Sequence, residues 1–197
     1  LSVRIGWLAQ PCTVLGAFAL YTTHFAATLG CECTHLSVEE YITRASEADA
    51  GAVDRIVAEY RTAYDVDDSI TEEDLEATAR VEIALRGMVR DHGLAALTYQ
   101  FMAFGEDERT PTVPFVGMSR LMAEGVGFGG EGDVIACAGS LLLNALCPPA
   151  SFSEIFTVDY AGNSVFLSHM GEANVAMARR EIKPPLRKRP GPITTTR

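Results

Sequence analysis

The chain has 197 residues, of which 48% are hydrophobic, 21% charged and 8% aromatic. This length suits one medium domain, or one domain and part of a second, and the apolar fraction excludes a disordered chain. The formal net charge of −10 argues against nucleic acid or an anionic membrane as the main partner. The charge is uneven, because residues 1–178 carry 9 basic and 25 acidic residues, whereas residues 179–197 carry 7 basic residues and one acidic residue. We therefore expect an acidic folded body and a basic, proline-rich tail.

The cysteines and the apolar segments indicate a cytoplasmic protein without a membrane partner. An odd number of cysteines without a CxxC pair does not form a disulfide framework, so reduced thiols are expected at Cys12, Cys31, Cys33, Cys137 and Cys147. The longest apolar run, residues 134–147, is too short to span a bilayer and contains Ser140 and Asn144. Polar residues interrupt any signal-peptide core in the first thirty residues.

The first 36 residues predict a strand, a helix and a second strand. Residues 2–8 are rich in β-branched and aromatic side chains, which favours a strand. Residues 17–29 have a helical pattern that stops at Gly30, a residue suited to a helix C-terminus. Residues 31–36 alternate in polarity as a strand does.

Three helices, a strand and a short fourth helix follow. Ser-Val-Glu-Glu at residues 37–40 forms a capping box that begins the first helix. The second helix carries an apolar stripe that comprises Ile56, Tyr60, Ala63 and Tyr64. The third helix begins at Thr71 and ends near Gly93. The next strand covers 94–101 and the last helix 114–124. Strands that alternate with helices indicate an α/β domain with a mainly parallel sheet of the Rossmann or flavodoxin type.

The pattern changes after residue 146. Residues 152–160 and 164–170 have the pattern of two strands around a tight Ala-Gly-Asn turn. We therefore predict three parts: an α/β domain over 1–132, a connecting helix and the opening strands of a β-rich domain over 133–178, and the tail over 179–197.

Two conspicuous motifs have structural explanations. Seven carboxylates within residues 65–76 are typical of a solvated loop and of a helix N-terminus, where negative charge is favourable. Residues 127–132 match GxGxxG, but a dinucleotide fingerprint follows a strand and opens a helix, whereas here a predicted helix comes first. We interpret the glycines as allowing a tight turn and the close approach of a ligand or another chain.

Three residues could form part of a metal site. Glu131 lies inside the glycine-rich turn, Glu154 lies early in the first late strand, and His169 ends the partner strand. Pairing of these strands would bring the regions of Glu154 and His169 toward each other. Two carboxylates and an imidazole are a partial ligand set for a divalent metal such as Mn²⁺. The spacing alone nevertheless favours surface carboxylates and an ordinary histidine at a strand end.

Three motifs occur in order in the second half of the chain. They are RLMAEGVGFGGEGD at 120–133, SFSE at 151–154 and SHM at 168–170. Together they resemble the L-arabinose isomerase family, to which the L-fucose isomerases are related more distantly. Residues 95–101 (AALTYQF) and the helix containing residues 79–82 also resemble the central domain of that family. The resemblance runs from about residue 30 to 178 and is absent from the tail.

The resemblance implies roles for five residues. Glu131 and Glu154 correspond to metal ligands that also transfer the proton, and His169 corresponds to a ligand histidine. Phe101 and Met170 match positions that line the sugar pocket. The family binds Mn²⁺, interconverts an aldose and a ketose, and works as an oligomer with sites at subunit boundaries. The loop at 105–111 and the sequence at 155–157 differ from the arabinose enzymes, so the sugar is not specified.

The chemistry fits these residue types. Moving a proton between C1 and C2 through an enediol needs a nearby carboxylate, and a bound divalent cation stabilises the negative charge that develops on O1 and O2. The family has a second ligand histidine farther downstream, whereas the other histidines of this chain, His24, His35 and His92, all precede Glu131. We therefore expect a fragment with an incomplete site and little or no isomerase activity on its own.

Further expectations concern the partners of the chain. An apolar face left by an incomplete β domain would be covered by self-association, so we expect a homo-oligomer that binds a small sugar. The tail is expected to be a solvated end rather than an arm that binds nucleic acid. Two alternatives stay open: a non-catalytic α/β module for oligomerisation or sugar binding, and a different metal-assisted enzyme on a related scaffold.

Overall fold

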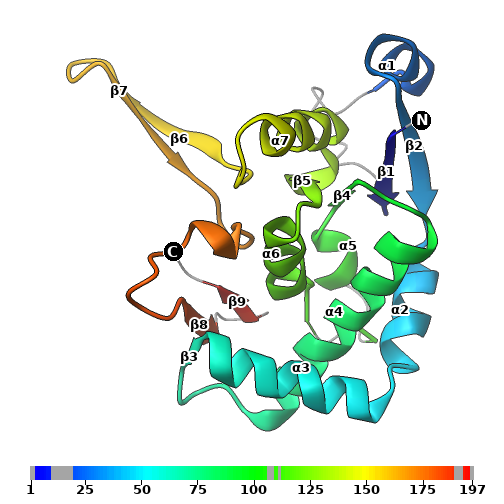
Figure 1. Cartoon of the computed structure of the whole chain (residues 1–197), viewed down its shortest axis with the longest axis vertical. Coiled ribbons are helices and arrows are strands. Elements are labelled where there is room, and N and C mark those ends of the chain that lie inside the picture. The colour runs from blue at the N-terminus through cyan, green and yellow to red at the C-terminus, as the bar shows by residue number, and fades with distance from the viewer. Residues whose placement is uncertain (1–2, 10–19, 106–108, 111, 189–192, 196–197) are drawn as a thin grey trace.

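The computed structural model describes residues 3–9, 20–105, 109–110, 112–188 and 193–195. Its centre is a parallel four-stranded sheet in the order β2-β1-β4-β5 (Figure 1). The strands are β1 (Val3–Leu8), β2 (Cys31–Leu36), β4 (Ala96–Tyr99) and β5 (Gly127–Gly129). The second strand of this sheet, β2, lies on one side of β1, and the later strands β4 and β5 lie on the other side. This is the strand order of flavodoxin-like folds. The predicted α/β class is confirmed.

Helices cover both faces of this sheet. Because side chains alternate along a strand, Leu97 and Tyr99 face one layer, and Ala96 faces the other. The first layer contains α2 (Val38–Ser46), α4 (Glu72–Asp91) and α6 (Phe115–Ala123). Helix α3 (Ala50–Ala63) packs on α4, and the short α5 (Met102–Gly105) follows the carboxyl end of β4. The second contains α1 (Thr22–Leu29) and α7 (Val134–Leu146). In the described ranges, no helix is long and apolar enough to cross a membrane.

Local signals place most of these elements where they were predicted. Gly30 ends α1 in the left-handed conformation with φ of 68°. The Ser37 side chain accepts hydrogen bonds from two backbone N–H groups of α2, and both halves of the capping box between Thr71 and Asp74 are present at α4. Ala63, predicted on a buried stripe, is instead exposed, because α3 turns Val53, Val57 and Tyr60 inward. Residues 17–19 of the first predicted helix lie outside the described residues.

The glycine-rich segment contains a strand of its own. Residues 127–129 form β5, a 3₁₀ turn covers Gly130–Gly132, and α7 begins at Val134. A helix, α6, does come before this motif, as expected; the short strand lies inside the motif, and pairing with β4 rather than local propensity creates it. A Cβ atom on Gly129 would lie 2.2 Å from the Asp133 carbonyl oxygen. This glycine thus allows the turn to fold back against the start of α7.

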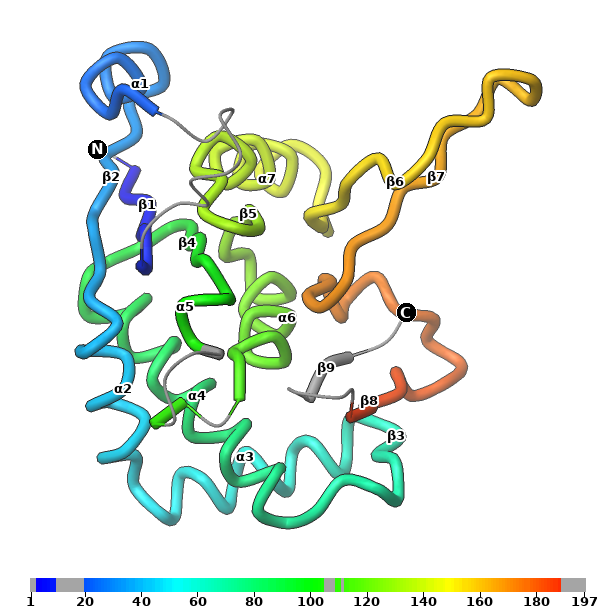
Figure 2. The backbone as a smooth tube through the Cα atoms, turned by 180° about the vertical axis from the view of Figure 1, so that it is seen from behind, coloured from blue at the N-terminus to red at the C-terminus, as the bar shows by residue number. Residues whose placement is uncertain are grey.

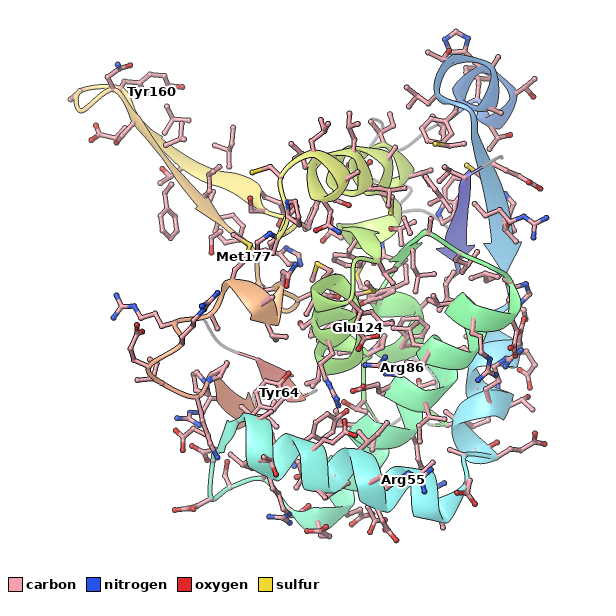
Figure 3. The ribbon with its side chains drawn as sticks, viewed as in Figure 1. Arg55, Tyr64, Arg86, Glu124, Tyr160 and Met177 are labelled. Carbon is pink, nitrogen blue, oxygen red and sulfur yellow. The ribbon has the colours of Figure 1, made fainter. Side chains whose placement is uncertain are left out.

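Two further strands form an exposed hairpin. β6 (Glu154–Asp159) and β7 (Ser164–Ser168) pair antiparallel, as predicted, and Asn163 in the turn has φ of 47°. The hairpin stands away from the rest of the molecule (Figure 2). Tyr160, at its tip, is 90% exposed (Figure 3). The root of the hairpin, in contrast, lies against the α/β body through Phe152, which packs on Phe128.

The basic tail is partly packed, so the expectation of a solvated end was wrong for residues 185–188. β8 (Pro185–Lys188) pairs in parallel with β3 (Asp65–Val66) and antiparallel with β9 (Ile193–Thr195). Arg187 forms ion pairs with Asp65 and Asp67, and Lys188 forms one with Asp74. Part of the acidic segment 65–76 is thus a docking surface for the tail. Residues 189–192, which include Pro190, lie outside the described residues.

Leu186 is the apolar anchor of this tail. It is fully buried in a cluster with Val57, Tyr60 and Leu75. We predict that Leu186→Ala lowers the free energy of unfolding by about 2–5 kcal/mol, because the substitution leaves a cavity. Urea denaturation followed by circular dichroism measures this change. The matched control is Ile182→Ala in the same tail, where the side chain is 61% exposed and the change should stay within about 0.5 kcal/mol. Equal stabilities of the two variants would contradict the packing of the tail.

Candidate functional site

A pocket lies where the carboxyl ends of β4 and β5 meet the root of the hairpin. Its volume is about 250 Å³. All five residues selected from the sequence line it, together with five others; the full lining is Tyr99, Phe101, Phe115, Gly130, Glu131, Glu154, Phe156, His169, Met170 and Glu172. The structure therefore brings the predicted site residues together from four separate segments, and their roles stay predictions.

The strand pairing explains why Glu154 and His169 meet. Glu154, the first residue of β6, is opposite Ser168, the last residue of β7. His169 follows directly, and its Nδ1 lies 2.8 Å from Glu154 Oε2. The side chain of Glu154 is 43% exposed, whereas that of His169 is 9% exposed. The histidine is thus fixed inside the protein, and the carboxylate reaches it from the solvent side.

Glu131 occupies an unusual backbone conformation between two glycines. Its φ of 58° lies in the left-handed region, which costs energy for a residue other than glycine. The conformation belongs to the 3₁₀ turn between β5 and α7 that brings Glu131 to the pocket. Partial burial raises the pKa of its carboxyl group, and the negative charge of Glu154 raises it further. Glu131 is consequently easier to protonate than an ordinary surface glutamate.

Glu172 is the buried carboxylate of the site. It is 3% exposed and accepts a hydrogen bond from the Tyr99 hydroxyl. Its other oxygen lies 2.9 Å from His169 Nε2. Burial, followed by the charge of Glu172, raises the pKa of Tyr99 well above its ordinary value, so the phenol remains a donor. A continuous chain of contacts therefore runs from β4 through Glu172 and His169 to Glu154.

The two carboxylates also set the protonation of His169. Burial lowers the pKa of the imidazole, but hydrogen bonds to Glu172 and Glu154 and their negative charges outweigh this effect, so the pKa is raised. Two aromatic rings pack against the imidazole: Phe152 edge-on at 4.8 Å between centroids, and Phe128 at 6.4 Å. The orientation of His169 is thus fixed by its polar partners and by its apolar surroundings.

Glu172 is the site residue that sequence reasoning missed. It lies three residues after His169, and Gly171 between them has φ of 135°. No periodic pattern marks this segment. The available signal was a carboxylate close in sequence to a candidate ligand histidine, because such histidines usually bond a second carboxylate through their other ring nitrogen.

The oxygen and nitrogen donors of the pocket suit a divalent cation in kind. Across the described ranges, however, no group of three or more histidine, cysteine, aspartate or glutamate side chains is placed to hold a metal ion. Each ring nitrogen of His169 is engaged by a carboxylate, Nδ1 by Glu154 and Nε2 by Glu172. The pocket thus contains candidate metal ligands, and we treat metal binding by them as a proposal.

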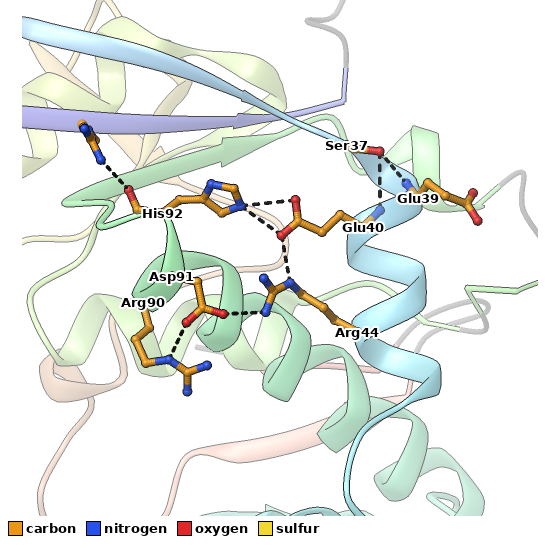
Figure 4. A network of polar contacts seen from close by, with 8 residues as sticks. Ser37, Glu39, Glu40, Arg44, Arg90, Asp91 and His92 are labelled. Carbon is orange, nitrogen blue, oxygen red and sulfur yellow. Dashed lines mark hydrogen bonds and ion pairs between the residues drawn. The ribbon is translucent and has the colours of Figure 1, made fainter.

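The other histidines have structural surroundings away from the pocket. His92 Nε2 donates to the Glu40 carboxylate at 2.9 Å, and Arg44 joins Glu40 to Asp91 (Figure 4). His35 stacks on Trp7 with ring centroids 5.0 Å apart. His24, in α1, is exposed. His169 is accordingly the histidine that the structure brings to the pocket.

Known proteins resemble much of this chain. Residues 23–146 match the family of the L-arabinose isomerase central domain. L-arabinose isomerase of Bacteroides thetaiotaomicron is 33% identical over 154 residues, which cover 71% of this chain and 30% of that protein. L-arabinose isomerase of Arthrobacter sp. (strain FB24) is 34% identical over 134 residues, or 64% of this chain and 26% of that protein. L-arabinose isomerase of Oceanobacillus iheyensis is 31% identical over 154 residues, which cover 73% of this chain and 31% of that protein.

These alignments define a region of larger proteins. The chain spans less than a third of the length of each of these relatives. The matched family, by contrast, covers most of the chain and includes three strands of the parallel sheet (β2, β4 and β5), the glycine-rich turn and α7. The chain therefore belongs to the L-arabinose isomerase central-domain family.

Proposed function

We propose that this chain carries part of the active site of a metal-dependent sugar isomerase that interconverts an aldose and a ketose. The observation that supports this proposal is the pocket itself, in which two glutamates and a histidine from separate segments lie beside Phe101 and Met170. The family membership supports a sugar as the substrate class. The sugar itself is set by pocket contacts that differ among isomerases.

The pocket residues fit a divalent cation such as Mn²⁺. Glu131 and Glu154 offer carboxylate oxygens, and Glu172 engages His169 Nε2 and so orients the ring. His169 Nδ1, which here lies 2.8 Å from Glu154 Oε2, would be the ligand atom of the histidine when a cation replaces that hydrogen bond. A bound cation would polarise the O1 and O2 atoms of the sugar and stabilise their negative charge. We propose these three residues as its ligands.

The glutamates are also proposed to transfer the proton. Isomerisation requires a carboxylate that removes a proton from one of C1 and C2 and returns it to the other. Glu131 suits this task because its raised pKa makes it a better proton acceptor than an ordinary carboxylate. Glu154 is the second member of the proposed pair. Phe101 and Met170 are proposed to line the part of the pocket that contacts the sugar.

Metal binding by the isolated chain tests the ligand assignment. We predict that Glu131→Gln and Glu154→Gln each weaken Mn²⁺ binding at least about 10-fold, because an amide oxygen replaces a charged ligand. Isothermal titration calorimetry with MnCl₂ measures the affinity. Glu47→Gln, at an exposed position outside the pocket, is the control and should bind Mn²⁺ like the wild type. Unchanged binding by both pocket variants would favour a non-catalytic sugar-binding or oligomerisation module.

The turnover of the chain is a separate prediction. Met170 is 63% exposed and Phe156 is 52% exposed, so the pocket is open to water. Among the described pocket residues, His169 also provides the only imidazole. We therefore predict little or no aldose–ketose conversion by the 197-residue chain with Mn²⁺. A panel of pentoses and 6-deoxyhexoses, assayed for ketose formation, checks this, and a clear rate with any of them would contradict it.

The exposed hairpin supports the proposal of a homo-oligomer. One of its faces carries four exposed aliphatic side chains, those of Ile155, Val158, Val165 and Leu167. An isolated two-stranded hairpin is marginally stable, and such a face is typical of an interface. We predict an oligomer by light scattering at micromolar concentration, and a shift toward monomer in Ile155→Thr/Leu167→Thr. A strictly monomeric wild-type chain would contradict this prediction.

A cytoplasmic location is also a proposal. The cysteines of the described residues all have free thiols: Cys31, Cys33, Cys137 and Cys147. Cys12 lies outside the described residues. Free thiols are typical of proteins in a reducing compartment.

A further inference from the structure

A buried asparagine lies just behind the candidate site. Asn174 is 3% exposed and follows Glu172 by two residues. It does not line the pocket, and the sequence alone gave it no role. The segment that contains it leads from His169 into a 3₁₀ turn (Val175–Met177) that packs on α6. Met177, the last residue of this 3₁₀ turn, is labelled in Figure 3.

The side chain of Asn174 joins three segments. Its Nδ2 group donates to the Met122 carbonyl oxygen at 3.1 Å and to the Ala150 carbonyl oxygen at 2.7 Å. Its Oδ1 atom accepts from the Ala176 backbone N–H at 3.0 Å. Two carbonyl partners require the amide nitrogen, and one N–H partner requires the amide oxygen, so only one orientation of this amide satisfies all three contacts.

Two serines fix the backbone of the same segment. The Asn174 N–H donates to Ser151 Oγ at 3.1 Å, and the Ala173 N–H donates to Ser119 Oγ at 3.0 Å. Ser119 belongs to α6, and Ser151 belongs to the linker that leads to Glu154. The segment directly after Glu172 is therefore tied to both the α/β body and the root of the hairpin.

These contacts determine where Glu172 can lie. The Glu172 carboxylate reaches Tyr99 on one side and His169 on the other, which requires its backbone to be held in place. The linker at 150–151 is fixed by the same asparagine, and it precedes Glu154 by only a few residues. We propose that Asn174 is a positioning residue that fixes Glu172, and through it the orientation of His169 relative to Glu154.

The main test observes His169 directly and needs no metal. In ¹⁵N-labelled protein, His169 should give a ring N–H signal that exchanges slowly with water, assigned by its loss in His169→Gln. Asn174→Asp keeps the shape of the side chain but places a carboxylate against two carbonyl oxygens. We expect the His169 signal to be lost to fast exchange in this variant. The ring signal of His92, which bonds Glu40 elsewhere, should persist as an internal reference.

A matched control separates positioning from general destabilisation. The side chain of Asn144 also contacts the linker, and its hydrogen bonds in the described residues are from the Ala150 N–H and to the Gly125 carbonyl oxygen rather than with residues 172–174. Asn144→Asp makes the same chemical change there and should retain the His169 signal. If Asn174→Asp does not fold, as judged by circular dichroism, Ser151→Ala provides the milder variant, with accelerated exchange expected at His169.

A second measurement rests on the proposed function. Asn174→Asp, or Ser151→Ala in its place, should bind Mn²⁺ about 10-fold more weakly than wild type, the scale seen when the support of a ligand histidine is altered. A wild-type chain that does not bind Mn²⁺ would overturn the proposed function and leave the exchange test of Asn174 intact. Slow exchange at His169 in the folded Asn174 or Ser151 variant, or equal loss in Asn144→Asp, would overturn the positioning role.

Discussion

The candidate site depends on one buried carboxylate, that of Glu172. A carboxylate that is removed from water must be hydrogen-bonded, because an unpaired buried charge is strongly unfavourable. Tyr99 of the central sheet and His169 at the end of the hairpin supply partners for its two oxygens. The contacts of Glu172 with Tyr99 and His169 therefore stabilise its buried charge and also join the α/β body to the hairpin. The pocket lies at this junction and takes one wall from each part.

This arrangement gives the hairpin a fixed root and an uncovered outer part. Near the root, Phe152 packs between His169 and Phe128. Farther out, the side chains of both strands are exposed, and Phe156 packs edge-on against Phe166. Hydrogen bonds and ring packing thus hold Glu154 and His169 at the base, while exposed apolar side chains begin directly beyond them at Ile155 and Leu167. Any partner that covers these strands would stabilise elements whose inner ends already belong to the site.

Sequence patterns could predict the elements that carry their own local signals. Ser37 and the pair Thr71 and Asp74 cap their helices as expected, and β2 has the predicted bounds. β5, with two glycines in three residues, could not be predicted, since it exists only through pairing with β4. The five candidate site residues were selected through motifs, whereas Glu172 and Asn174 join the pocket region through contacts between segments that no spacing rule connects.

The charge asymmetry of the chain is a second case in which contacts between distant segments could not be predicted from local sequence. It also indicates which interaction contributes most to the packing of the tail. The acidic segment and the basic tail each resemble solvated surface when considered alone, yet they lie against each other. Exposed ion pairs contribute about 0–1 kcal/mol each, whereas full burial of a leucine side chain contributes about 1.5–3 kcal/mol. Leu186 therefore supplies much of the binding of this strand. The ion pairs of Arg187 with Asp65 and of Lys188 with Asp74 favour the register in which Leu186 lies opposite Val66 and enters the core.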